Sequence, residues 1–242
     1  MKKNLFAIVI FFPLLMSQCA YQEKQKATPM GSIFNSMFIL NQDNSITYIN
    51  KIHGRHVMHT TPEEFGSPVI TVKNNRSFFM VSHLKGESRA NWTQLISVAS
   101  TKGVNIDELT MENIVQHQMG FYTEYCAPEK ISSTQDFPAI KFIDNHESML
   151  GVLACGDLIK KEDLKGSFET LYVNIKVPDG YYSIAWTERG PSVDMPLVID
   201  KEKWIKRLRQ LEPLEVLNHF PPKGTASPAP SKNTSLQPLG HP

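Results

Sequence analysis

The sequence predicts an α+β fold, in which a mostly antiparallel β-sheet is packed by two helices within a single domain. Two observations carry this prediction. Apolar residues alternate with polar ones along much of the middle of the chain, which is the period of a half-buried strand. Two further segments repeat their apolar residues at the spacing of a helix face.

The clearest strand pair lies in "TLYVNIKVPDGYYSIAWTER". Apolar residues occupy alternate positions over 171–177 and again over 182–186, and Pro178-Asp179-Gly180 between them has turn chemistry. The stretch therefore predicts a β-hairpin. Weaker strand signals lie at Ser36–Leu40, Ser45–Asn50, Val69–Lys73, Ser77–His83, Trp92–Ser97, Ala139–Ile143 and Met149–Cys155.

The first helix is expected after Thr110, a suitable N-cap, and Pro128 ends it. Its apolar stripe consists of Met111, Ile114, Val115, Met119, Tyr122 and Tyr125. The second helix is expected after Asp200, with Glu202 in the first turn, and Pro213 stops it. Its buried face should contain Trp204, Ile205, Leu208 and Leu211.

The N-terminus has the three parts of a secretory signal: Lys2 and Lys3, an apolar run over 5–16, and then Ser17-Gln18-Cys19. The run is too short to span a bilayer, which takes about 20 helical residues. The stretch Leu14–Cys19 resembles the signal of bacterial lipoproteins, in which the cysteine is lipidated and becomes the first residue of the mature chain. Gln18 departs from the Gly, Ala or Ser that this family usually has there. Ordinary secretion with nearby cleavage and a retained helical anchor are the alternatives.

These features divide the chain into four parts. Residues 1–18 form the signal peptide, 19–34 the lipidated cysteine and a polar tether, 35–220 a single α+β domain, and 221–242 a disordered Pro-rich tail. If Cys19 is lipidated, Ala20 rather than Asp after it implies sorting to the outer membrane, as in the Gram-negative lipoprotein family. We therefore expect a bacterial outer-membrane protein that faces the periplasm, or a secreted one if Cys19 is not lipidated.

The charge and the cysteines narrow the class of protein further. Removal of Lys2 and Lys3 leaves 25 − 2 = 23 basic residues against 24 acidic ones, which does not favour nucleic-acid binding. Cys126 and Cys155 form an even pair in an exported chain, and this predicts a disulfide in the oxidising periplasm. A catalytic thiol is the alternative, although it would need a neighbouring base.

The stretch "HGRHVMH" holds three histidines, His53, His56 and His59, and imidazole is a common metal ligand. On a strand His53 and His56 face opposite sides, and His53 and His59 lie about 20 Å apart at ~3.3 Å per residue. We therefore expect a solvated loop or a pH-sensitive contact surface, with no metal and no cofactor. Tyr181 alternates with the residues of the buried hairpin face and is a candidate for an exposed contact.

Catalytic motifs of the nucleophile-elbow, phosphate-loop, dinucleotide and zinc-protease types do not occur in the sequence. The element order over about Phe38 to Leu217, with strands, a helix, strands including a hairpin and a terminal helix, resembles that of the PsbP-like family of exported accessory domains. The resemblance implies a binding or assembly-support protein. The leading hypothesis is a non-catalytic, lipid-anchored envelope protein that binds another envelope protein. The alternatives are a small-ligand or metal carrier and a hydrolase that acts on envelope substrates.

Overall fold

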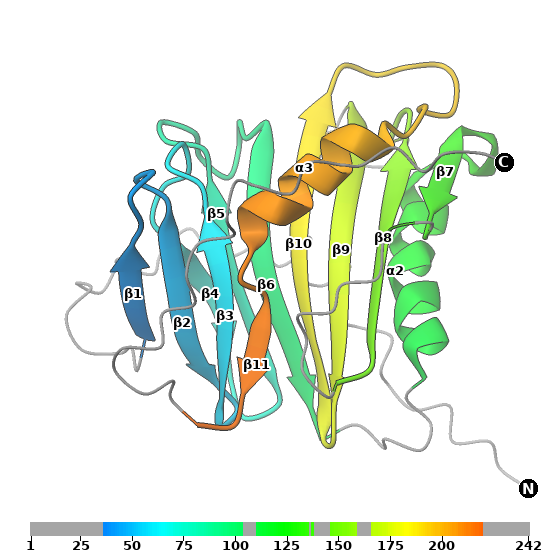
Figure 1. Ribbon diagram of the computed structural model, residues 1–242. Helices are drawn as coiled ribbons and strands as arrows, with labels where there is room; N and C mark the ends of the chain where they lie inside the picture. Colours follow the sequence, from blue (N-terminus) through cyan, green and yellow to red (C-terminus); the bar gives the residue numbers. More distant parts are fainter. Residues whose placement is uncertain (1–35, 104–109, 136, 138–145, 159–165, 220–242) are drawn as a thin grey trace, which may run out of the picture.

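The computed structural model describes residues 36–103, 110–135, 137, 146–158 and 166–219, which form two antiparallel sheets and two α-helices (Figure 1). The α+β class predicted from the sequence is confirmed. The signal, the tether, the Pro-rich tail and the expected strand Ala139–Ile143 lie outside the described residues.

The larger sheet contains seven strands, and every neighbouring pair is antiparallel. In spatial order they are β4 (Val69–Lys73), β5 (Ser77–His83), β6 (Gln94–Lys102), β10 (Gly180–Gly190), β9 (Ser167–Val177), β8 (Ser148–Cys155) and β7 (Ile131–Thr134). The predicted hairpin forms β9 and β10, which pair from Val177 and Gly180 at the turn to Ser167 and Gly190 at the far end.

The smaller sheet consists of β1 (Ser36–Leu40), β2 (Ile46–Ile52), β3 (Arg55–Thr61) and β11 (Glu215–Leu217), in this order. In the β1–β2 turn, the amide of Asn44 donates to the carbonyl of Asn41 at 3.1 Å, and Asn44 has a φ of 60°. This is a three-residue hairpin loop whose last residue is left-handed. The β2–β3 turn has two residues, His53 and Gly54, with φ values of 49° and 87°.

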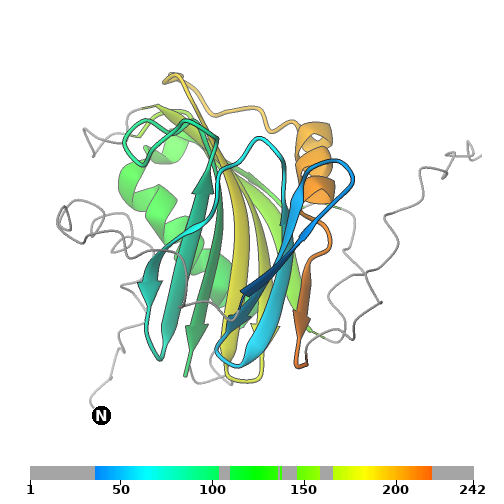
Figure 2. The same ribbon diagram turned by 90° about the vertical axis from the view of Figure 1, so that its left-hand side faces the viewer.

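The main core lies between the large sheet and a layer formed by the small sheet and α3 (Lys201–Leu211) (Figure 2). Asp200 caps α3, because its carboxylate accepts a hydrogen bond from the amide of Lys203 at 3.0 Å. The predicted inner face of α3 is confirmed for Trp204, Leu208 and Leu211, whereas Ile205 is half-buried. Trp186 is fully buried in this core, as its place in the alternation predicted.

The opposite face of the large sheet is covered by α2 (Met111–Tyr125). Thr110 is its N-cap, as predicted, and accepts a hydrogen bond from the amide of Asn113 at 3.0 Å. Five of the six residues of the predicted apolar stripe are buried, and the sixth, Met119, packs against the cluster that contains Val115, Tyr122 and Tyr125. A short 3-10 helix, η2 (Pro128–Lys130), follows α2.

The predicted disulfide between Cys126 and Cys155 is present, with an S–S distance of 2.06 Å and a Cα–Cα distance of 6.1 Å. Cys126 is the C-cap of α2, and Cys155 is the last residue of β8. Both side chains are buried. The bond therefore fastens the outer helix to the large sheet.

Three strands were not expected from the sequence: β3, β7 and β11. The histidine stretch was expected to be a solvated loop or a pH-sensitive contact surface, and the expectation of a loop was wrong. It forms the β2–β3 turn and most of β3, because Gly54 readily adopts the positive φ that a two-residue hairpin turn requires.

Candidate functional site

The small sheet ends in an apolar edge strand, β1. Met37, Phe38, Ile39 and Leu40 expose 48%, 70%, 37% and 65% of their surface. Large apolar side chains of a folded domain are normally buried. A group of them exposed together is typical of an interaction site. Figure 1 shows β1 at the outer end of the small sheet. Among the described strands, β1 pairs with β2 on one side and with no strand on the other.

The other three sheet edges in the described residues carry features that discourage pairing. The strand β4 has a bulge between Ile70 and Val72 and ends at the exposed Lys73. The strand β11 has three residues and includes Glu215, and β7 has four residues, of which 132–134 are polar. By contrast, β1 has five residues in unbroken register with β2 and carries no charge, proline or bulge. It is the edge that is open to another strand.

The backbone of β1 is positioned for such pairing. The amide of Asn41 donates to the carbonyl of Ser45 at 2.9 Å, so these two residues form a hydrogen-bonded pair at the turn. Hydrogen-bonded and non-hydrogen-bonded pairs alternate along an antiparallel ladder. The peptide groups of residues 37 and 39 therefore point toward β2, and those of Ser36, Phe38 and Leu40 point outward from the sheet.

The side chains of β1 continue a row that leads into the core. Phe38 is the register partner of Tyr48, which is the partner of His59, so the three rings share one face of the sheet. Val57, two residues before His59, belongs to the core between the sheets, which makes this the inner face. Exposure falls along the row, from 70% for Phe38 through half-buried Tyr48 to 1% for His59. The apolar edge is therefore continuous with the interior of the domain.

Tyr48 and His59 stack with ring centroids 5.7 Å apart. Burial lowers the pKa of His59 to about 4, so this imidazole is neutral in the folded protein at physiological pH. Its Nδ1 atom has no hydrogen-bond partner in the part of the chain that the structure describes. The inner end of the aromatic row is thus an uncharged imidazole stacked on Tyr48.

Charges stand at the two ends of β1. The turn at the Leu40 end carries exposed Asp43, and Asn44 Nδ2 donates to the carboxylate of exposed Glu63 at 3.4 Å. At the other end, exposed Lys51 follows Asn50, which is the register partner of Ser36. One end of the edge is therefore acidic and the other basic.

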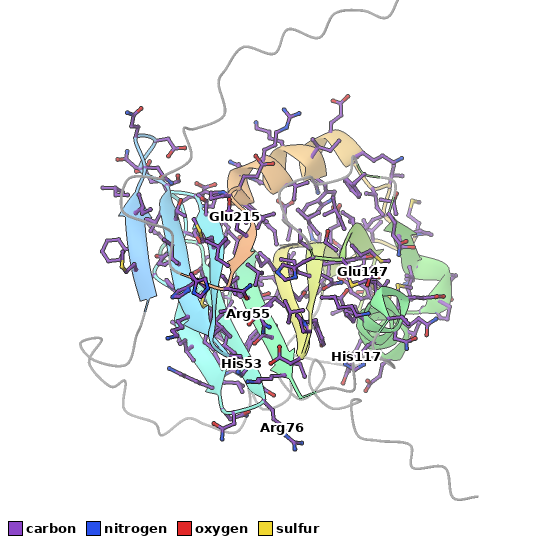
Figure 3. The ribbon with its side chains drawn as sticks, turned by 60° about the horizontal axis from the view of Figure 1, so that its bottom comes forward. His53, Arg55, Arg76, His117, Glu147 and Glu215 are labelled. Atoms are coloured by element: carbon purple, nitrogen blue, oxygen red, sulfur yellow. A yellow bond between two sulfur atoms is a disulfide. The ribbon has the colours of Figure 1, made fainter. Side chains whose placement is uncertain are left out.

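The three candidate histidines do not converge. His53 lies in the β2–β3 turn, His56 is half-buried and faces away from the large sheet, and His59 faces the core. Burial lowers the pKa of both His53 and His56. Figure 3 labels His53 next to Arg55, and also His117 of α2, which belongs to the opposite side of the large sheet. Among the described residues, no group of three His, Cys, Asp or Glu side chains is placed to hold a metal ion.

The β2–β3 turn is held against the large sheet by a partly buried ion pair and a buried hydrogen bond. Arg55 donates to the carboxylate of Asp179 at 2.6 Å, and Tyr182 Oη donates to the carbonyl of Ile52 at 2.9 Å. Lys102 of β6 also lies 3.5 Å from Asp179. These contacts tie the β2–β3 turn to the large sheet, and β1 pairs with β2 along the strand that leads into this turn.

Tyr181 lies on the opposite face of β10 from Tyr182, as predicted, but it is not well exposed. It packs against the pair Met111 and Ile114 of α2 and is half-buried. Burial raises the pKa of its hydroxyl. The reason is that α2 covers this face of the large sheet, which the alternation within β10 does not reveal.

The sequence reasoning found β1 as a strand but did not identify it as the candidate site. A run of four apolar residues without a charge is also typical of a buried strand. Cys19, the candidate lipidation site, lies outside the described residues. No helix in the described ranges combines the length and the apolar character that crossing a membrane requires. The chain matches no family model and no curated protein.

Proposed function

We propose that this protein is a non-catalytic, lipid-anchored envelope protein that acts as a binding or assembly-support module for other envelope proteins. The observation that carries the proposal is β1, an exposed apolar edge strand. The other edges among the described strands, β11 of the same sheet and β4 and β7 of the large sheet, are short or interrupted by a bulge. An extended segment of a partner polypeptide can bind an open edge like that of β1 by becoming the next strand of the sheet. Hydrogen bonds between the two backbones then provide affinity, and alternate side chains of the segment provide specificity. The resemblance in layout to the PsbP-like family favours the same class of protein.

The proposed anchor is Cys19, with the mature chain at the outer membrane and facing the periplasm. Since β1 begins 36 − 19 = 17 residues after Cys19, a lipid there would keep the edge strand near the membrane surface. Replacement of Cys19 with Ser should release the mature chain into the soluble periplasmic fraction or leave it unprocessed. An intact mass with an unmodified mature N-terminus would contradict the anchor.

The binding role is tested by a site-specific photo-crosslinker in the full chain in its native envelope. A benzophenone amino acid at position 37 on β1 should give crosslinks to a partner polypeptide, mapped by mass spectrometry to this strand. The matched control is position 69 on β4, because Val69 is also an exposed apolar residue on an edge strand, with 57% of its surface exposed. Products from position 37 should disappear when Ile39→Lys is added. Identical products from both positions would contradict binding through β1.

A carrier and an envelope hydrolase are the alternative functions. Within the described ranges, neither has a supporting observation comparable to the open edge of β1. The open edge of β1 therefore favours a binding function.

A further inference from the structure

We infer that the strand that pairs with β1 is β1 of a second copy of this chain, antiparallel about a two-fold axis at Phe38. The inference rests on the proposed binding role of β1, and it names the partner of that edge as a second copy of this chain and not a different envelope protein. It also explains why this one edge lacks the bulge, short length or charge that the other three have. Two open edges of the same kind close each other, and neither then remains free to aggregate.

The backbone fits this arrangement. Phe38 points both of its peptide groups outward, so the two copies of Phe38 would exchange both hydrogen bonds as a central pair. Ser36 of each copy would make the same exchange with Leu40 of the other. The residues whose peptide groups already bond to β2, Met37 and Ile39, would then form the intervening non-hydrogen-bonded pairs. The register that satisfies every outward group of β1 is thus centred on Phe38.

The side chains also fit it. A two-fold axis perpendicular to the sheet leaves inner faces joined to inner faces. On that face Phe38 of one copy would lie beside Phe38 of the other, and aromatic pairs across strands are among the favourable ones. On the other face Met37 would lie beside Ile39 of the second copy. The exposed apolar side chains of β1 in each chain would thus be covered by β1 of the other chain.

Charge selects the antiparallel orientation over the parallel one. Asp43 stands at the Leu40 end of the edge and Lys51 beyond the Ser36 end. Antiparallel pairing brings the acidic turn of each copy to the same end of the dimer as Lys51 of the other copy. Two to three strand spacings of ~4.8 Å separate that turn from Lys51, which is a distance of about 12 Å. This is slightly more than the Debye length of about 10 Å at 0.1 M salt, so the attraction is largely screened there and favours the antiparallel orientation mainly at low ionic strength, where the Debye length is about 30 Å at 0.01 M salt. Parallel pairing would put acidic ends together and basic ends together.

The decisive experiment is disulfide trapping in the full chain. In the proposed register the two copies of residue 38 have Cα atoms about 5.5 Å apart, which is within the range that a disulfide bridges. Phe38→Cys should therefore give a covalent dimer on mild oxidation. Val69→Cys on β4, exposed and apolar as well, is the matched control and should stay monomeric. Co-expressed Ser36→Cys and Leu40→Cys chains should crosslink to each other faster than either crosslinks to itself.

Analytical ultracentrifugation of the full chain gives an independent measurement. The unmodified chain should be dimeric, and Ile39→Lys should shift it to monomer while Val69→Lys does not. Circular dichroism establishes that each variant is folded, and Ile39→Thr, a milder change, should weaken the dimer in the same direction. A monomeric unmodified chain, or equal trapping at positions 38 and 69, overturns the inference.

The photo-crosslinking experiment separates this inference from the proposed function. Crosslinks from position 37 that join two copies of this chain support the inference. Crosslinks from position 37 to a different polypeptide, with no trapping at position 38, overturn the inference and leave the proposed function intact. Absence of both products contradicts the inference and the proposed function together.

Discussion

Glu169 and Glu188 stand directly opposite each other on β9 and β10, and one ammonium group contacts both carboxylates. Lys203 Nζ lies 2.9 Å from Glu169 and 3.3 Å from Glu188. Trp204 also donates to Glu169 at 2.8 Å, and Arg207 donates to Glu188 at 2.9 Å. Like charges directly opposite in a strand pair are destabilising. In this fold they instead provide the acceptors that hold α3 on the large sheet.

The first prediction is that Lys203→Met destabilises the domain by about 1–3 kcal/mol, because it removes two charge-assisted contacts and leaves two carboxylates facing each other. Urea unfolding followed by circular dichroism measures the change. Lys206→Met, on the exposed side of α3, should change the free energy of unfolding by less than about 0.5 kcal/mol. Adding Glu169→Gln to Lys203→Met should recover part of the loss. Equal effects of the two lysine variants would disprove the bridge.

The second prediction concerns the disulfide. Cys126 and Cys155 are 29 residues apart, and a bond that closes a loop of that length stabilises the fold by about 3–4 kcal/mol in the chain-entropy model. The double variant Cys126→Ala, Cys155→Ala should lose this amount in urea unfolding. Addition of dithiothreitol should lower the unfolding midpoint of the unmodified chain and leave that of the double variant unchanged. A midpoint insensitive to reduction would show that the bond does not stabilise the domain.

The third prediction tests the turn that orders the histidine stretch. Gly54 has a φ of 87°, and no atom lies within 4 Å of the position that a Cβ would take. The cost of Gly54→Ala is therefore backbone strain alone, about 1–2 kcal/mol. His53→Asn should raise the stability, because Asn-Gly is the preferred pair in such turns. The urea midpoint should be highest for His53→Asn, intermediate for the unmodified chain and lowest for Gly54→Ala. An unchanged midpoint for Gly54→Ala would contradict the turn.

Elements with a long, regular pattern could be predicted from the sequence. Hairpin β9–β10, the caps Thr110 and Asp200 and the helix faces were found because each signal is local. No comparable local signal exists for β11, which has three residues and pairs with β3 from more than 150 positions away. Short strands have too few residues to show a period, and their pairing is decided by the fold.

The candidate site could be predicted less well, for a related reason. Whether the run at β1 is buried or exposed depends on the order of strands in the small sheet, which sequence alternation does not contain. Tyr181 was expected to be exposed because of its face, and α2 turned out to cover that face. His59 became buried because the large sheet lies over the inner face of β3. In each case the environment comes from a distant element.

The fourth prediction is that acid destabilises the domain through His59. Burial lowers its pKa from 6.5 to about 4 in the folded protein. Between these values the unfolded chain binds a proton that the folded one does not, so stability is complete above pH 6.5 and falls as the pH drops toward 4. A shift of this size corresponds to about 3 kcal/mol at pH 4. Urea unfolding from pH 7 to pH 4 should show this decline.

His59→Phe isolates that contribution, because a phenyl ring can keep the stack on Tyr48 and does not titrate. The variant should lose the largest single part of the dependence of stability on pH between 6.5 and 4, and the remainder reflects the other histidines whose pKa burial lowers, such as His53 and His56. His56→Phe is the matched control on the same strand and the opposite face, where the imidazole is only half-buried. It should keep most of the dependence, since the buried imidazole remains. If both variants flatten the pH profile equally, the decline does not originate in the burial of His59 between the two sheets.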